Sequence, residues 1–376
     1  MNKTIWYAVY VFFASLLLMV GYLMVTSGSV NAQEFSVRGR LHLDAFYGIN
    51  DADNFSNGFN NRRARMGMGG TVTENWDGRI EVDFADGGVS PNDFRLRRSF
   101  PHGGRLWMGQ FKVPQGLNQL TSSNQFTFIE RSMINNIIAD ARRLGMAYEL
   151  NKGLLGFKTM VFGRALGQRG ALESDMPIGG ALRGYYFPQI GEGQLHIGAS
   201  GVYEELFSNK GVSFSDRPES RDSKGGSVRL IRANVPDAVS TFKLGGELLY
   251  INGPFSIEGE YQQVTVNNSK GANPTFFGWV VQTSYVLTGE SRSYRNGALG
   301  GISPKGENGA WEIALRYSYM NLNDKDFDGG EQSNITFGLN RYVTSRLRFM
   351  GNIVYVNLDY TDDNPLLGVV RAQYNF

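Results

Sequence analysis

Long stretches of this sequence alternate between apolar and polar residues, and this pattern limits the possible folds more than any other feature. Residues 255–262 read Phe-Ser-Ile-Glu-Gly-Glu-Tyr-Gln, and residues 35–45 and 311–319 follow the same pattern. Successive side chains of a β-strand point to opposite faces, so each stretch predicts a strand with one apolar and one polar face. The chain is therefore expected to be all-β.

Two all-β architectures are consistent with this alternation. In a soluble sandwich the apolar faces pack together, whereas in a transmembrane barrel they contact lipid and the polar faces line a wet lumen. The composition excludes other classes. With 48 Gly, 13% aromatic and only 19% charged residues, the chain resembles neither a disordered protein nor a helical bundle. Trp and Tyr residues near the strand ends favour the barrel, because they are typical of membrane interfaces.

The first 32 residues have the pattern of a secretory signal peptide. Lys3 precedes a nearly unbroken apolar run at residues 11–25, and the small residues at 30–32 offer a cleavage site. The alternative is a permanent anchor, because residues 5–25 could just span a bilayer. We expect cleavage, since no basic cluster follows the apolar run. Residues 1–32 are thus predicted to be a signal peptide.

The remaining residues, 33–376, are predicted to form a single barrel domain. Residues 365–376 alternate and end on Phe376, which resembles the closing strand of bacterial outer-membrane barrels. A membrane-crossing strand takes about 9–11 residues plus a connection. Sixteen strands would use about 21 residues each and would leave an aqueous lumen. The prediction is a transmembrane antiparallel β-barrel of about 16 strands that forms a channel.

The scarcity of Cys and His and the small net charge argue against a metal ion, a cofactor and nucleic acid as partners. The chain has no Cys and only three His, so no metal site and no cofactor are expected. A net charge of +2 gives no indication of nucleic acid as a partner. The charge is uneven, however. Residues 33–170 carry 18 Lys and Arg against 13 Asp and Glu, so positive charge is concentrated in the first half of the barrel domain.

A series of motifs runs in order along the whole barrel domain. They lie at residues 35–44, 62–67, 76–84, 109–132, 287–294 and 309–318. Together they resemble the phosphate-selective porin O and P family. The resemblance implies a homotrimer of 16-stranded barrels in the bacterial outer membrane. It also implies loops folded into the lumen as a constriction, and Arg and Lys side chains that converge on an anion site.

The candidate site residues lie on the predicted strands and in one long connection. Residues 114 to about 139 are the expected constriction, because a 26-residue connection is too long for a compact barrel unless it has a function. Arginine suits an anion path, since its planar guanidinium donates paired hydrogen bonds to phosphate and stays charged. Arg62, Arg63, Arg79 and Asp93 are implied by the resemblance. The full set of predicted anion-binding and pore-lining residues is Arg38, Arg40, Arg62, Arg63, Arg65, Arg79, Asp93, Arg95, Arg97, Lys112 and Arg131.

Two positions depart from the family pattern. This chain has Gln119 and Asn124 where selective members of the family carry Lys or Arg, so the predicted site lacks two of its usual basic groups. The expected partners are small anions (phosphate or polyphosphate), outer-membrane lipid and two further copies of the chain. The alternative from the same fold is a general diffusion porin, in which the arginines pair with nearby carboxylates such as Glu81 and Glu130.

An enzyme and a surface adhesin are the alternatives from other classes. His196 and Ser200 lie on one face of a predicted strand, but at about 3.3 Å per residue they are roughly 13 Å apart, too far for a catalytic pair. No other catalytic arrangement is present, and the modest loop lengths do not favour an adhesin. The chain is therefore not expected to be an enzyme.

Overall fold

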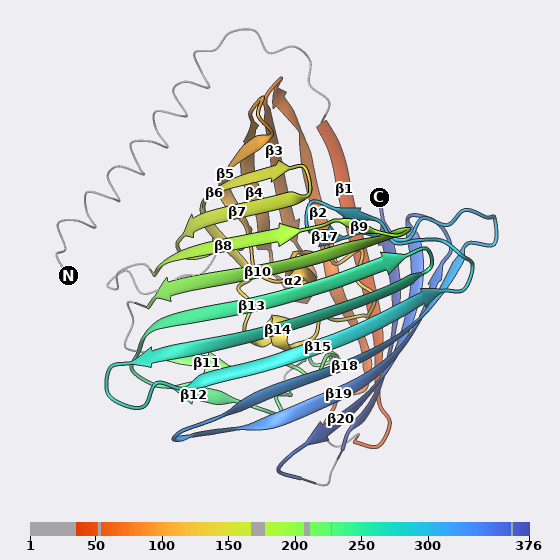
Figure 1. Ribbon diagram of the computed structural model, residues 1–376. Coiled ribbons are helices and arrows are strands. Elements are labelled where there is room, and N and C mark those ends of the chain that lie inside the picture. The colour runs from red at the N-terminus through yellow and green to blue at the C-terminus, as the bar shows by residue number, and fades with distance from the viewer. Residues whose placement is uncertain (1–34, 52–53, 167–176, 207–210, 227, 362–363) are drawn as a thin grey trace, which may run out of the picture.

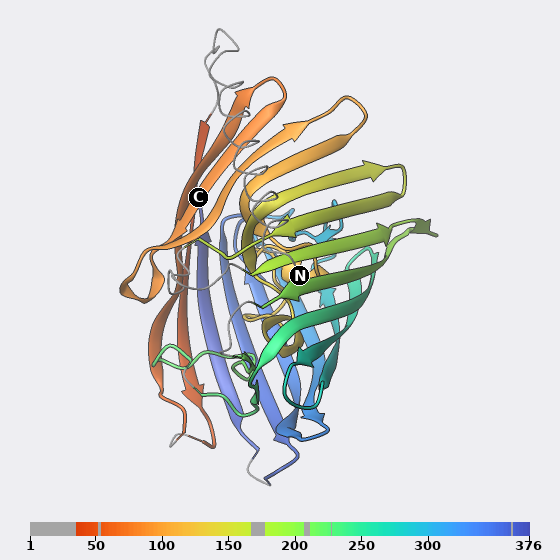
Figure 2. The ribbon, with the colours of Figure 1, turned by 90° about the vertical axis from the view of Figure 1, so that its left-hand side faces the viewer.

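The computed structural model describes most of the chain after residue 34 (Figures 1 and 2). The described residues are 35–51, 54–166, 177–206, 211–226, 228–361 and 364–376. The predicted signal peptide, residues 1–32, lies outside them. None of the helices within these ranges has the length and apolar character needed to cross a membrane.

Sixteen antiparallel strands close into a barrel, which confirms the predicted fold class and strand number. Strand β1 pairs with both β2 and the last strand, β21, and this closes the cylinder. The barrel strands are β1 (Phe35–Gly48), β2 (Gly58–Thr73), β3 (Trp76–Asp83), β4 (Ser90–Ser99), β5 (Gly104–Lys112), β6 (Arg142–Lys152), β7 (Leu155–Phe162), β8 (Ile178–Tyr186), β10 (Gly193–Glu205), β13 (Ala238–Asn252), β14 (Phe255–Asn268), β15 (Thr275–Val286), β18 (Ala310–Asp324), β19 (Phe327–Tyr342), β20 (Leu347–Leu358) and β21 (Leu366–Asn375).

The remaining elements are short and lie in the connections between barrel strands. The two-residue β9 (Gln189–Ile190) pairs with the start of β10. The other short elements are η1 (Ala85–Gly87), α2 (Leu117–Leu120), α3 (Met133–Ile137), β11 (Val212–Phe214), β12 (Ala233–Val235), β16 (Tyr294–Arg295) and β17 (Ala298–Leu299).

The apolar faces of the strands point outward, as expected of a barrel in a membrane. On β13 the outward Leu244 and Leu248 are 41% and 48% exposed, whereas the inward Lys243 and Glu247 are buried. In water such a surface would cost free energy at every exposed apolar side chain, but in a bilayer these side chains contact lipid. The burial pattern therefore decides between the two all-β architectures in favour of the membrane barrel.

The outward position of Leu244, in the middle of β13, leads to a stability prediction. Leu244→Arg should make folding into lipid vesicles less favourable by about 2–4 kcal/mol, because the charge would enter the hydrocarbon core. The measurement is urea titration of refolding in vesicles. Val239→Arg, near the end of the same strand, should cost about 0–1 kcal/mol. Equal costs at the two positions would contradict the membrane orientation of this face.

Residues 113–141, which connect β5 to β6 and are called the inward segment below, pack against the inner wall. Arg371 on β21 donates to the Ile129 carbonyl at 2.6 Å, and Arg348 on β20 donates to the Phe126 carbonyl at 2.6 Å. In Figure 1, α2 of this segment lies within the ring of strands. Side chains of distant strands thus satisfy backbone groups that a buried connection would otherwise leave unpaired.

Two further connections also reach the interior, and the sequence patterns did not predict this. In the connection between β10 and β13, Glu219 pairs with Arg316 at 2.7 Å and accepts a hydrogen bond from the Met133 amide at 2.9 Å. In the connection between β15 and β18, Arg292 pairs with Glu312 of β18 through two of its nitrogens. Much of the lumen wall on the β13–β21 side is therefore covered by connecting segments.

Candidate functional site

A bulge in β2 directs two successive arginines into the lumen. The register with β1 shifts between His42 and Leu43, which pair with Arg63 and Asn61, so Arg62 is the extra residue. Arg62 donates to both oxygens of Glu130 at 2.6 and 2.8 Å, and Arg63 approaches the same carboxylate at 3.8 Å. The paired arginines thus meet the inward segment at Glu130.

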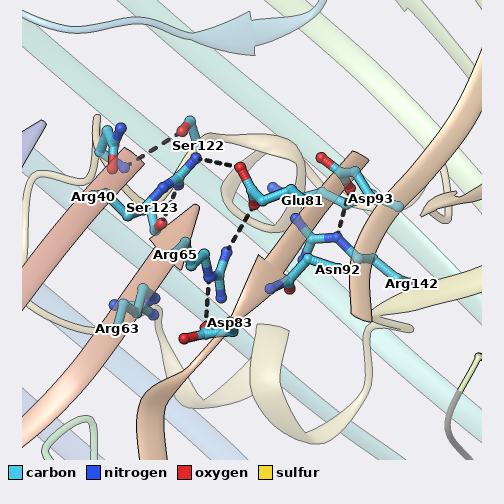
Figure 3. A network of polar contacts seen from close by, with 12 residues as sticks. Arg40, Arg63, Arg65, Glu81, Asp83, Asn92, Asp93, Ser122, Ser123 and Arg142 are labelled. Atoms are coloured by element: carbon cyan, nitrogen blue, oxygen red, sulfur yellow. Dashed lines mark hydrogen bonds and ion pairs between the residues drawn. The ribbon is translucent and has the colours of Figure 1, made fainter. Parts of the chain in front are cut away.

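Glu81 is the centre of a group of arginines on the inner wall (Figure 3). Its Oε2 accepts from Arg79 at 2.6 Å and from Arg40 at 3.1 Å. Its Oε1 lies 3.7 Å from Arg65, which also forms a 2.6 Å contact with Asp83. One buried carboxylate therefore contacts three guanidinium groups that come from β1, β2 and β3.

Asp93 has a similar place on the neighbouring strand β4. It accepts from Arg142 of β6 at 2.7 Å and lies 3.5 Å from Arg79. In Figure 3, Arg142 and Asp93 lie on one side of Glu81, and Arg40 and Arg65 lie on the other. Arg79 therefore links the two acidic groups.

Arginines also face each other directly across the sheet. Arg40 pairs in register with Arg65, and Arg79 pairs with Arg95. Like charges directly opposite each other destabilise a sheet unless a counter-charge lies between them. Each of these four arginines has a carboxylate nearby, namely Glu81, Asp83, Asp93 or Asp77. Asp93 and Asp77 are also shared with Arg142 and Arg97, so the six arginines outnumber the four carboxylates and positive charge is left in excess.

The side chains around Glu81 and Asp93 enclose a cavity of about 260 Å³. Nine basic residues and only two acidic ones line it, together with the hydroxyls of Ser122 and Ser123. Ser123 accepts from Arg40 at 2.8 Å, so the inward segment forms part of the wall. The basic lining residues are Arg40, Arg63, Arg65, Arg79, Arg95, Lys112, Arg131, Arg142 and Lys158.

A wider cavity of about 740 Å³ adjoins the first and shares Arg79, Glu81 and Arg95 with it. Arg38 and Arg97 add positive charge there. Glycines of β2 also line this cavity and place no side chain in it. Basic groups therefore continue from the inward segment toward the start of β1.

Two of the predicted site residues, Lys112 and Arg62, use most of their hydrogen bonds to hold the inward segment. Lys112 donates to the carbonyls of Gln119, Leu120 and Thr121 at 2.7–3.0 Å. These three bonds use all the donors of an ammonium group. Arg62 is bound to Glu130, as described above. Lys112 therefore contributes charge to the cavity but no free donor.

Arg131, in the inward segment, has a mixed role. It donates to the carbonyls of Asn118, Gln119 and Thr121 at 3.1–3.3 Å, and its guanidinium lies over the Phe126 ring at 4.4 Å. Burial and the nearby Arg142 lower the pKa of Arg131 to about 9. It therefore remains charged at neutral pH and adds to the positive field of the cavity.

The structure adds Arg142, Lys158 and Trp107 to the cavity wall, none of which was among the predicted site residues. Arg142 directly follows the inward segment, and Lys158 is the inward residue between Phe157 and Thr159 in an alternating strand. Alternation could have indicated both as lumen residues. Their distance from the other arginines, however, depends on how the barrel curves, which no sequence pattern states.

The two positions without the expected basic group do not line the cavity. The Gln119 side chain donates to the Asp140 carbonyl at 2.9 Å. The Asn124 carbonyl accepts from Gln373 at 3.1 Å. Both residues help to position the inward segment, while Arg142 and Lys158 supply positive charge to the cavity from β6 and β7.

Comparisons with known proteins give a consistent result. Residues 35–376 match the family model described as phosphate-selective porin O and P. Porin O of Pseudomonas aeruginosa is 25% identical over 390 residues, which cover 91% of this chain and 88% of that protein. An uncharacterized protein of Caulobacter vibrioides is 29% identical over 362 residues, 91% of this chain and 71% of that protein.

Solved structures share the fold at low sequence identity. The anion-selective porin from Comamonas acidovorans has a TM-score of 0.58 and 14% identity, covering 92% of this chain and 100% of that one. The trimer form of OmpT from Vibrio cholerae has a TM-score of 0.60 and 12% identity, with the same coverage of both chains.

Proposed function

Because this chain belongs to the phosphate-selective porin O and P family, as its motifs predicted, we propose that it passes small anions, phosphate and polyphosphate among them. It is an outer-membrane channel and not an enzyme. The anion preference is supported by one observation above all. Nine basic and two acidic residues line the cavity around Glu81 and Asp93, and the inner wall places arginines directly opposite each other.

The arginines suit transport rather than permanent capture. Glu81 and Asp93 already accept hydrogen bonds from Arg40, Arg79 and Arg142. An entering phosphate competes with these carboxylates for the guanidinium donors, so each new contact replaces an existing one. Binding is therefore shared among several weak sites, which is what a channel needs if the ion is to leave. The inward segment narrows the path and forms one wall of the cavity.

The export route and the assembly complete the proposal. Residues 1–32 act as a cleaved signal peptide, and the mature chain inserts into the bacterial outer membrane with its apolar face against lipid. Three copies assemble into a homotrimer. The trimer form of OmpT, whose fold resembles that of this chain, supports this assembly.

Phosphate block of chloride current tests the proposed substrate. Single channels in a planar bilayer would carry chloride, and phosphate would be added in steps. We expect the current to fall at submillimolar phosphate. Phosphate offers several oxygen acceptors to the arginine donors, whereas chloride is a single atom and cannot accept paired hydrogen bonds on separate oxygens. An unchanged current at all phosphate concentrations would leave a general diffusion porin as the function.

The salt dependence of selectivity is a second prediction. The anion-to-cation permeability ratio should fall toward unity as the salt concentration rises from 0.1 to 1 M, because the Debye length shrinks from about 10 to 3 Å. The measurement is the reversal potential at a fixed concentration ratio and increasing total salt. A ratio that does not depend on salt would indicate selection by size alone.

A further inference from the structure

Trp107 on β5 is surrounded by three cations on the inner wall of the barrel. The Lys158 ammonium lies 3.6 Å from the centroid of its ring, the Arg95 guanidinium 4.4 Å and the Arg97 guanidinium 5.2 Å. Each of these positions is within the range of a cation–π contact. Trp107, Lys158 and Arg95 all line the smaller cavity.

The strand register explains how these groups meet. Arg97 lies directly opposite Trp107 on β4. On the other side the opposite residue is Ala147 of β6, whose small side chain leaves room for Lys158 to reach across from β7. Phe111 packs against the indole ring at 5.5 Å. The ring therefore contacts Phe111 and three cations.

Carboxylates near this cluster balance only part of its charge. Lys158 lies 3.4 Å from Glu149, and Asp77 is shared between Arg97 at 2.6 Å and Arg95 at 3.5 Å. An aromatic ring attracts a cation without neutralising it, whereas a carboxylate cancels its charge. Trp107 can therefore hold Lys158 and Arg95 in place and leave their charge available to an anion in the cavity.

We propose that Trp107 is a positioning residue for anion selectivity, and that Lys158, which it holds at the cavity wall, supplies positive charge that Gln119 and Asn124 lack. The inference rests on the proposed function, since it concerns the same cavity. The ring does not bind the passing anion itself. It fixes two cations that do.

The test uses the purified full-length channel in a planar bilayer under a potassium chloride gradient. Trp107→Leu should lower the anion-to-cation permeability ratio about two- to fivefold, the range expected when cation–π contacts are lost. Trp107→Phe keeps an aromatic face and should retain most of the selectivity. The matched control is Trp279→Leu, the same change on the outward face, which should leave the ratio unchanged.

Lys158→Met keeps the length of the side chain and removes its charge, and should lower the ratio by a similar factor. Lys152→Met, at the exposed end of β6, is its control. If Trp107→Leu fails to fold, the Lys158→Met result decides. A selective wild type whose Trp107→Leu and Lys158→Met variants match their controls would overturn the inference. A wild type without anion selectivity would instead refute the proposed function.

Discussion

Arg79→Gln should raise the phosphate concentration that halves the chloride current by about 10- to 100-fold. Arg79 and Arg95 are the basic residues common to both cavities. The Arg79 side chain is the more accessible of the two, at 28% exposed against 14% for Arg95, so it can meet an ion on either side. A hydrogen bond to a charged group contributes about 1.5–3 kcal/mol, which corresponds to this range of affinity. The measurement is the phosphate concentration that halves the chloride current.

Arg346→Gln is the matched control, because Arg346 lies exposed in the connection between β19 and β20. It should leave the half-blocking concentration unchanged. The anion-to-cation permeability ratio of Arg79→Gln should also fall, since the substitution leaves Glu81 and Asp93 with fewer guanidinium partners. If the same phosphate concentration half-blocked the Arg79→Gln and Arg346→Gln channels, Arg79 would have no role in the ion path.

Glu130→Gln should lower the free energy of unfolding by about 3–5 kcal/mol, the usual effect of removing one partner from a buried ion pair. Glu130 accepts from Arg62 at 2.6 Å and from Arg371 at 3.1 Å, and lies 3.8 Å from Arg63. Burial alone would raise the pKa of Glu130, but Arg62 and Arg63 hold it well below its ordinary value. The neutral amide would leave these buried arginines with too little counter-charge.

Urea unfolding of the reconstituted protein measures this loss. Glu307→Gln, at an exposed position in the connection between β15 and β18, is the control and should change the free energy little. We also expect higher single-channel conductance from Glu130→Gln, because the inward segment loses its attachment to β2 and β21. Equal stability of the two variants would show that Glu130 does not anchor this segment.

The sequence was informative wherever structure depends on neighbouring residues. The alternation around Ile257 and Glu258 is a local property of a strand, and the structure places Ile257 outward and Glu258 inward. The same rule placed Arg40, Arg65 and Arg79 on the polar face, and all three line the cavity.

The interior contacts could not be predicted because they join distant residues. Glu219 meets Arg316, about 100 positions later in the chain, and no periodic pattern marks the segment that carries Glu219. Lys112 shows a related difficulty. Its position predicted a pore-lining cation, but whether its donors face an ion or nearby carbonyls depends on how the inward segment folds.

The most direct test of the proposed function is the sign and size of the reversal potential of the wild-type channel in a planar bilayer, under a tenfold potassium chloride gradient at low total salt. A path lined by an excess of arginine and lysine predicts a strong preference for chloride over potassium. A reversal potential near zero, or one of the sign expected for potassium, would contradict the conclusion that these arginines select the ion.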